Sequence, residues 1–271
     1  MCCAADHEYS AVGEDVEDNG ADLVAASALI DDLVLANHIL FDQNVVDGFG
    51  HVSVRHDKNP QRFLLARNMA PGNVTHNDII EFTIDSEPVN ARGRKVYLER
   101  FIHGEIYRRR PDVKAIVHSH SHAIVPLSVV KNERLRAMFH MAGFIGQKAP
   151  VFEIREAGGD GTDLLIRSNL LGRALAEKFD QNEIVLMRGH GSTVVAGSVQ
   201  QAVYRAVYAE LNARYQIEAM RMGEVTYLTE NESMEAAKNI EAQVHRPWDL
   251  WVEQARSRRQ SYKSYDSGVG K

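Results

Sequence analysis

The feature that most constrains this chain is a short apolar run at residues 115–117 that leads directly into alternating histidines, His118, His120 and His122. The apolar run predicts a strand, and side chains two residues apart in a strand point to the same face. His118 and His120 can therefore reach one point in space if the strand continues that far. Neutral imidazole is the commonest protein ligand for divalent transition metals. We therefore expect half of a metal site here. His122 points away if the strand has ended before it, and otherwise it is a further candidate ligand.

The third ligand must come from elsewhere, because a catalytic metal site commonly has three protein ligands and an open position. His190 is the best candidate, since it follows an apolar strand predicted at residues 183–187 and lies between Gly189 and Gly191. Glycines on both sides allow a close backbone approach or a sharp turn. Taken singly, each histidine also fits a structural role, as a hydrogen-bonded core group, an exposed edge residue or a turn residue.

Glu99 lies near the start of a helix predicted over residues 99–110, just before the histidine strand. If this helix start faces the metal, Glu99 becomes a general acid or base. A glutamate in a first helical turn is also simply a favourable charge at the helix N-terminus, so the position alone leaves both roles open. His103 lies four residues later on the same face and is expected in the core or beside the ligands.

Composition excludes several classes of function. The 271 residues carry a formal net charge of -6, so nucleic acid is not expected as a partner. No apolar run approaches the roughly 20 residues of a membrane span, and the N-terminus does not resemble a secretory signal. The only cysteines, Cys2 and Cys3, are adjacent and make a poor disulfide framework. We therefore expect a cytoplasmic protein.

The order of the predicted elements favours one α/β domain. Residues 1–20 are small and acidic and are expected to form a flexible or loosely docked arm, followed by a domain over residues 21–271 that ends in a basic tail with Trp248 and Trp251. Helices are predicted at residues 22–43, 99–110, 123–130, 163–179, 231–243 and after Ser198. Strands are predicted at residues 51–55, 63–66, 79–84, 115–120, 151–154, 183–187, 193–196 and 225–228. Because several neighbouring strands look hairpin-connected, the sheet is expected to be mixed or mainly antiparallel.

Four short motifs, in this order and at these spacings, resemble the class II aldolase/adducin family over residues 22–225. The motifs are Gly50-His51-Val52-Ser53-Val54-Arg55, Glu99 with His103, Val117-His118-Ser119-His120, and Arg188-Gly189-His190-Gly191. The resemblance implies a three-layer α/β/α domain around a central, mainly antiparallel sheet. It implies one divalent metal, Mn(II) or Zn(II), per subunit, held by the three histidines His118, His120 and His190, with a functional acid at Glu99. It also implies a homotetramer or another homo-oligomer with active sites at subunit interfaces, where His140 aligns with a catalytic tyrosine from the neighbouring subunit.

The chain departs from the phosphate-using members of that family at the positions that cradle phosphate. His51 stands at an asparagine position, Arg67 and Asn68 at a Thr-Gly pair, and Tyr97 and Leu98 at two serines. Small donors that suit phosphate are therefore gone. An apolar wall with one guanidinium suits a planar carboxylate ligand better, with Arg188 as a second anion contact.

This altered pocket resembles the branch of the family that decarboxylates hydroxylated aromatic acids, such as the hydroxypyridine dicarboxylates of vitamin B6 breakdown. The resemblance predicts a metal-dependent carbon–carbon lyase in which Glu99 or His140 returns a proton to the ring. Arg67 and Arg188 would then hold a second carboxylate. An aldolase or epimerase acting on a non-phosphorylated hydroxy acid or sugar is the alternative. A non-catalytic adducin-like interaction domain is a third reading, which has no need for His118, His120, His190 and Glu99 together.

Overall fold

The computed structural model describes residues 10–12, 15 and 23–268. Its centre is a seven-stranded sheet in the order β4-β3-β2-β6-β9-β8-β7. All neighbouring strands are antiparallel except β7 and β8, so the predicted mainly antiparallel sheet is confirmed. The strands are β2 (His51–Arg55), β3 (Arg62–Ala66), β4 (Ile79–Thr83), β6 (Ala115–Ser119), β7 (Val151–Phe152), β8 (Ile184–Met187) and β9 (Gly191–Ala196).

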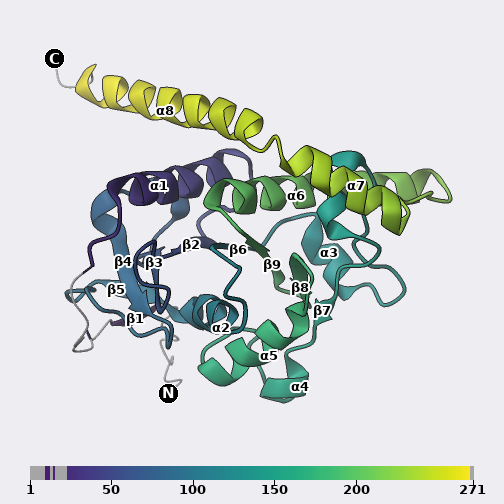
Figure 1. Cartoon of the computed structure of the whole chain (residues 1–271), viewed down its shortest axis with the longest axis horizontal. Coiled ribbons are helices and arrows are strands. Elements are labelled where there is room, and N and C mark those ends of the chain that lie inside the picture. The colour runs from purple at the N-terminus through teal and green to yellow at the C-terminus, as the bar shows by residue number, and fades with distance from the viewer. Residues whose placement is uncertain (1–9, 13–14, 16–22, 269–271) are drawn as a thin grey trace, which may run out of the picture.

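Helices cover both faces of this sheet, which gives the predicted three layers (Figure 1). One face carries α1 (Ser27–Asp42), α6 (Val199–Met222) and α8 (His245–Gly268), and the other carries α2 (Phe101–Arg109) and α5 (Asn169–Phe179). Every residue of β2, β6, β8 and β9 is buried, as expected for strands that have a helix layer on each side. Three further helices, α3 (Ile124–Val129), α4 (Arg155–Gly158) and α7 (Glu230–Glu241), lie at the margin of the sheet.

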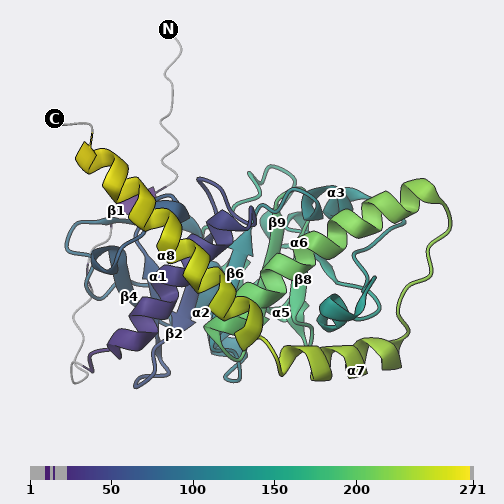
Figure 2. The same ribbon diagram turned by 90° about the horizontal axis from the view of Figure 1, so that it is seen from above.

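The C-terminal segment differs from the prediction, because the expected basic tail is the helix α8. Trp248, Trp251 and Ala255 recur at helical spacing and are buried, and α8 packs across α1 (Figure 2). The strand predicted at residues 225–228 is also wrong. This segment forms no strand. The Leu228 amide donates to the Ala137 carbonyl, and the Leu228 carbonyl accepts from the Gln147 side chain.

Two helices begin five or six residues later than predicted, α1 at Ser27 and α5 at Asn169. At the start of α5 the Ser168 hydroxyl accepts a hydrogen bond from the Leu171 amide. Part of the predicted N-terminal arm is docked, since β1 (Ser10–Val12) pairs with β5 (Lys95–Tyr97). Asp15 of the arm accepts hydrogen bonds from the Ala91 and Arg92 amides, and the other arm residues, with Cys2 and Cys3, lie outside the described residues. The cytoplasmic location stays a prediction. No helix in the described part of the chain combines the length and apolar composition that a bilayer crossing requires.

Candidate metal centre

The pairing of two central strands brings the predicted ligands together. β6 carries His118 as a fully buried residue and leads into His120, while β9 begins directly after His190. Ser119 of β6 lies opposite Ser192 of β9, so His190 stands beside the end of the histidine strand. Gly191 is required at this crossing, because a Cβ there would collide with the backbone oxygen of Ser119.

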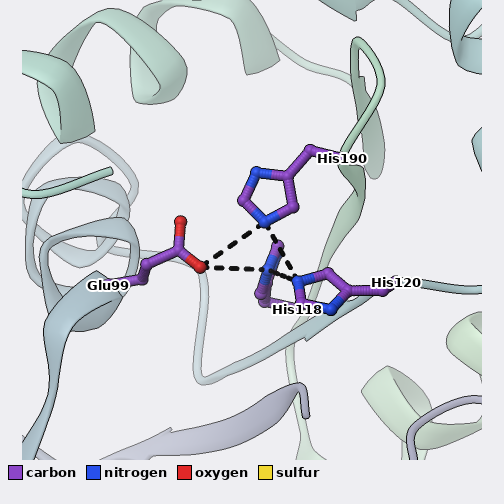
Figure 3. Close-up of side chains that lie close together, drawn as sticks. All are labelled: Glu99, His118, His120 and His190. Atoms are coloured by element: carbon purple, nitrogen blue, oxygen red, sulfur yellow. Dashed lines mark hydrogen bonds and ion pairs between the residues drawn. The ribbon is translucent and has the colours of Figure 1, made fainter. Parts of the chain in front are cut away.

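Glu99, His118, His120 and His190 converge on one point (Figure 3). Nε2 of His120 lies 3.2 Å from Nε2 of His118 and 3.0 Å from Nε2 of His190. Oε2 of Glu99 lies 3.7 Å from Nε2 of His118 and 3.5 Å from Nε2 of His190. Ligand atoms bound tetrahedrally at zinc distances are roughly 3.4 Å apart. The four donor atoms therefore fit a single divalent ion.

A loop before α5 orients two of these four groups. Nδ1 of His190 donates to the Leu164 carbonyl at 2.9 Å, which fixes its proton on Nδ1 and leaves the Nε2 lone pair facing the cluster. Oε1 of Glu99 accepts the Ile166 amide at 2.9 Å, so its other oxygen is turned toward the histidines. Sequence reasoning missed this loop, because backbone groups carry no signature in the sequence.

The surroundings of His118 and His120 keep both rings neutral, as metal ligands must be. Burial, followed by the nearby His190, lowers the pKa of His118 well below its ordinary value and also lowers the pKa of His120. Both are therefore neutral donors at neutral pH. Burial alone would lower the pKa of His190 as well, but the hydrogen bond and charge of Glu99 more than offset it, and the pKa is raised.

A cavity of about 140 Å³ opens beside the centre. Four residues predicted to bind substrate line it, namely His51, Asn68, Tyr97 and Leu98, together with Glu99 and His120 of the cluster. Sequence reasoning missed the other large lining side chains, Phe49, Met69 and Leu165. The Tyr97 hydroxyl donates to the Met69 carbonyl at 2.5 Å, and burial raises its pKa to about 12. Tyr97 therefore remains a neutral phenol whose proton is already engaged.

The two predicted guanidinium contacts do not line this cavity. Nε of Arg67 pairs with Oδ1 of Asp78 at 2.6 Å, and Nε of Arg188 pairs with Oε2 of Glu153 at 2.5 Å. The expectation that they hold a substrate carboxylate therefore does not fit their positions in this chain, because each already has a carboxylate partner.

Two other predicted histidines lie outside the cluster. His140 begins a 3₁₀ turn at His140–Ile145, is exposed, and lines a separate cavity with Tyr204 and Leu250. His122 is exposed beyond the end of β6, as its place after the strand predicted. Within one chain, neither contributes a donor atom to the cluster.

A buried chain of hydrogen bonds supports His51 from behind. Its Nδ1 lies 2.7 Å from Nε2 of His103, whose Nδ1 lies 2.6 Å from the Ser53 hydroxyl, which in turn lies 2.8 Å from the Tyr107 hydroxyl. Burial lowers the pKa of His103 to about 3, so it stays neutral. The His51 ring lies 4.9 Å from the ring of His118, so this chain fixes a side chain that packs on a cluster histidine.

A second buried support reaches the loop that follows His120. Glu210 of α6 is 1% exposed and accepts hydrogen bonds from the Ser121 hydroxyl and, at 3.0 Å, from the Ala123 amide. Its other oxygen pairs with Arg214 at 2.7 Å. A helix 87 residues away in the sequence thereby fixes the turn between His120 and α3.

Comparison with known proteins gives a family and several relatives. Residues 31–217 match the family model described as "Class II Aldolase and Adducin N-terminal domain". Decarboxylase tropJ of Talaromyces stipitatus is 37% identical over 238 residues, which cover 79% of this chain and 89% of that protein. A 3,4-dihydroxyphthalate decarboxylase of Arthrobacter keyseri is 27% identical over 205 residues, which cover 70% of this chain and 78% of that protein.

Among solved structures, the L-fuculose 1-phosphate aldolase from Glaciozyma antarctica PI12 superposes with a TM-score of 0.70. The sequence identity is 19%, and the match covers 85% of this chain and 90% of that one. At this identity the likeness concerns the fold alone.

Proposed function

Since this chain belongs to the class II aldolase and adducin family, we propose that it is a metal-dependent lyase that decarboxylates a hydroxylated aromatic acid. The observation that carries the proposal is a cluster of three imidazoles and one carboxylate beside a cavity with apolar walls. Two relatives that match most of the chain are named as decarboxylases, and one of them acts on a dihydroxyphthalate.

His118, His120 and His190 would hold one divalent ion, with Glu99 as a fourth donor or a neighbour. Three imidazoles suit Zn(II), and an added carboxylate also suits Mn(II). When bound, the ion supplies a Lewis acid that polarises a substrate oxygen ortho to the departing carboxylate.

Decarboxylation breaks the bond between a ring carbon and its carboxylate carbon. Carbon dioxide leaves, the electron pair remains on the ring, and one proton must replace the lost group. Glu99 faces both the cluster and the cavity, so it is placed to take the proton of the substrate hydroxyl and return it to the ring carbon. His140 of a neighbouring subunit is the alternative proton donor, in the homotetramer or other homo-oligomer that we propose.

The cavity walls would hold the ring. Tyr97 and Leu98 supply apolar surface, while Asn68 and His51 supply polar contacts near the centre. Arg67 and Arg188 have no part in this proposal, because each pairs with a carboxylate of the protein. The substrate ring would be a benzene or a pyridine, and 3-hydroxy-2-methylpyridine-4,5-dicarboxylate of vitamin B6 breakdown is one candidate.

A product assay tests the function. The metal-loaded protein would be offered ortho-hydroxybenzoates, hydroxypyridine dicarboxylates and sugar acids, and carbon dioxide would be followed beside aldehydes and ketones. We expect carbon dioxide from an aromatic acid and no carbonyl product. Aldehyde or ketone from a sugar acid would instead establish the aldolase alternative. A protein with neither bound metal nor turnover would be the interaction domain.

A further inference from the structure

The cavity beside the metal centre also constrains how many carboxylates a substrate carries, provided that the proposed function holds. A carboxylate that leaves water for an apolar cavity costs several kcal/mol unless a charge or hydrogen bonds compensate it. One carboxylate can be compensated at the metal centre itself. A second one, on the far side of the ring, needs its own partner in the cavity wall.

The described residues of one chain that line the cavity offer no positive charge for it, and the polar side chains of the wall outside the ligand cluster are Asn68, His51 and Tyr97. None of the twelve lining residues is an arginine or a lysine. The large wall residues are apolar or aromatic, namely Phe49, Met69, Tyr97, Leu98 and Leu165. The hydroxyl proton of Tyr97 is engaged by the Met69 carbonyl, and Nδ1 of His51 faces His103. The wall away from the centre therefore presents mainly apolar surface.

The two guanidinium groups that the sequence predicted at the substrate, those of Arg67 and Arg188, are paired with carboxylates of the protein. Asp78, the partner of Arg67, also accepts hydrogen bonds from the Thr75 amide and hydroxyl, which hold it in place. Glu153, the partner of Arg188, also binds Arg155 at 2.8 Å. Turning either arginine toward a substrate would break an ion pair that the fold has already formed.

The charges at the centre balance one carboxylate. A divalent ion brings two positive charges, and the Glu99 carboxylate removes one of them. The one remaining positive charge is neutralised by a single substrate carboxylate. A second carboxylate would leave an uncompensated negative charge beside apolar walls.

We propose that this chain selects ortho-hydroxylated aromatic monocarboxylates and discriminates against dicarboxylates, accepting an alkyl group where a phthalate carries its second carboxylate. This selectivity separates the chain from the Arthrobacter keyseri relative, whose named substrate is a dicarboxylate. It also removes 3-hydroxy-2-methylpyridine-4,5-dicarboxylate from the candidate substrates and leaves the aromatic monocarboxylates.

Three acids that differ at one ring position test the proposal. In 2,3-dihydroxybenzoate that position carries hydrogen, in 2,3-dihydroxy-6-methylbenzoate a methyl group, and in 3,4-dihydroxyphthalate a carboxylate. The dissociation constant would be measured by calorimetry on the Mn(II)-loaded protein, and kcat/KM by carbon dioxide release. Relative to hydrogen, we expect the methyl compound to bind about threefold more tightly. The phthalate should bind at least about tenfold more weakly and lose kcat/KM to the same extent.

A cation placed in the wall should reverse this preference. Met69→Lys keeps the length of the side chain and brings an ammonium group into the cavity, so kcat/KM for the phthalate should rise at least about tenfold relative to 2,3-dihydroxybenzoate. Met222→Lys adds the same charge at a position that is 87% exposed at the end of α6 and should leave the ratio unchanged. If Met69→Lys does not fold, the binding and turnover of the three acids by the wild-type protein still test the proposed selectivity.

The outcomes separate this proposal from the proposed function. Equal or tighter binding and faster turnover of the phthalate by the wild-type protein would overturn the selectivity while the decarboxylase function stood. If none of the acids released carbon dioxide but the order of binding held, the decarboxylase function would fail while the selectivity stood.

Discussion

At the scale of single residues, Glu99 carries the proposed chemistry. Glu99→Gln keeps the size and the hydrogen bond from the Ile166 amide but cannot accept and return a proton. We expect kcat to fall by about two to four orders of magnitude, with the metal still held by three histidines. Metal content and kcat would be measured on the same preparation, with Glu218→Gln, at an exposed position of α6, as the control. A variant that keeps its metal and turns over at the wild-type rate would show that Glu99 is not the proton carrier.

The ligand residues could be predicted from the sequence, and the guanidinium positions could not. His118 and His120 follow from the two-residue period of a strand, and His190 from a turn between glycines after a buried strand. Arg67 and Arg188 were expected at the substrate because the sequence shows a cation but not its partner. Their partners lie 11 and 35 residues away, and only the fold brings them together.

At the scale of elements, α6 holds the turn after the histidine strand through Glu210. Glu210→Ala leaves the Ser121 hydroxyl and the Ala123 amide without their buried acceptor. We expect the free energy of unfolding to fall by about 2–3 kcal/mol and the affinity for the metal to fall with it, because the turn carries His120. Denaturant unfolding and metal titration would measure the two effects.

Glu218→Ala is the matched control for Glu210, because it removes an exposed ion pair with Arg221 from the same helix. This change should cost less than about 0.5 kcal/mol and leave metal affinity unchanged. Wild-type metal affinity in Glu210→Ala would show that the turn needs no such support.

The packing of α1 against α8 predicts a pH dependence of stability. His38 of α1 has its pKa lowered to about 4, first by burial and then by Arg259 of α8. The unfolded chain therefore takes up this proton near pH 6.5, before the folded chain does, so stability falls as the pH drops from about 6.5 toward 4. His38→Gln keeps a donor for the Val74 carbonyl. Between pH 7 and pH 5, the free energy of unfolding of this variant should fall by up to about 2 kcal/mol less than that of the wild type. Parallel pH profiles of the unfolding free energy would contradict this role.

Element types were predicted well where apolar periodicity was strong, and poorly at the C-terminus. Trp248, Trp251 and Ala255 have helical spacing, but the basic and polar residues around them resemble a solvated tail. The helix is stabilised because these three side chains are buried by packing against the rest of the domain, including α1. This packing is a tertiary contact, which the local sequence does not show. The segment at residues 225–228 has the apolar character of a strand but no neighbouring strand with which to pair.

At the scale of the whole molecule, the three layers follow from strands that are apolar on both faces, which the sequence shows. The assembly remains a prediction, and His140 tests it, because it is exposed and lies outside the cluster of its own chain. If His140 of a neighbouring subunit supplies the proton, which is the alternative to Glu99, then His140→Ala and His118→Ala are each inactive alone. Mixed and reassembled, they should recover up to roughly a quarter of the wild-type activity, since random pairing joins an intact His118 to an intact His140. No recovery, with both variants shown to exchange subunits, would place His140 outside the neighbouring active site.

The central claim is that Glu99, His118, His120 and His190 form a metal centre that carries out decarboxylation. The most direct measurement is the number of divalent ions bound per chain, taken beside carbon dioxide release before chelation, after chelation and after Mn(II) or Zn(II) is restored. We predict one ion per wild-type chain, loss of turnover on chelation, recovery on restoring the ion, and weak metal binding in His190→Ala. Undiminished carbon dioxide release from a metal-free chain, or wild-type metal binding in His190→Ala, would contradict it.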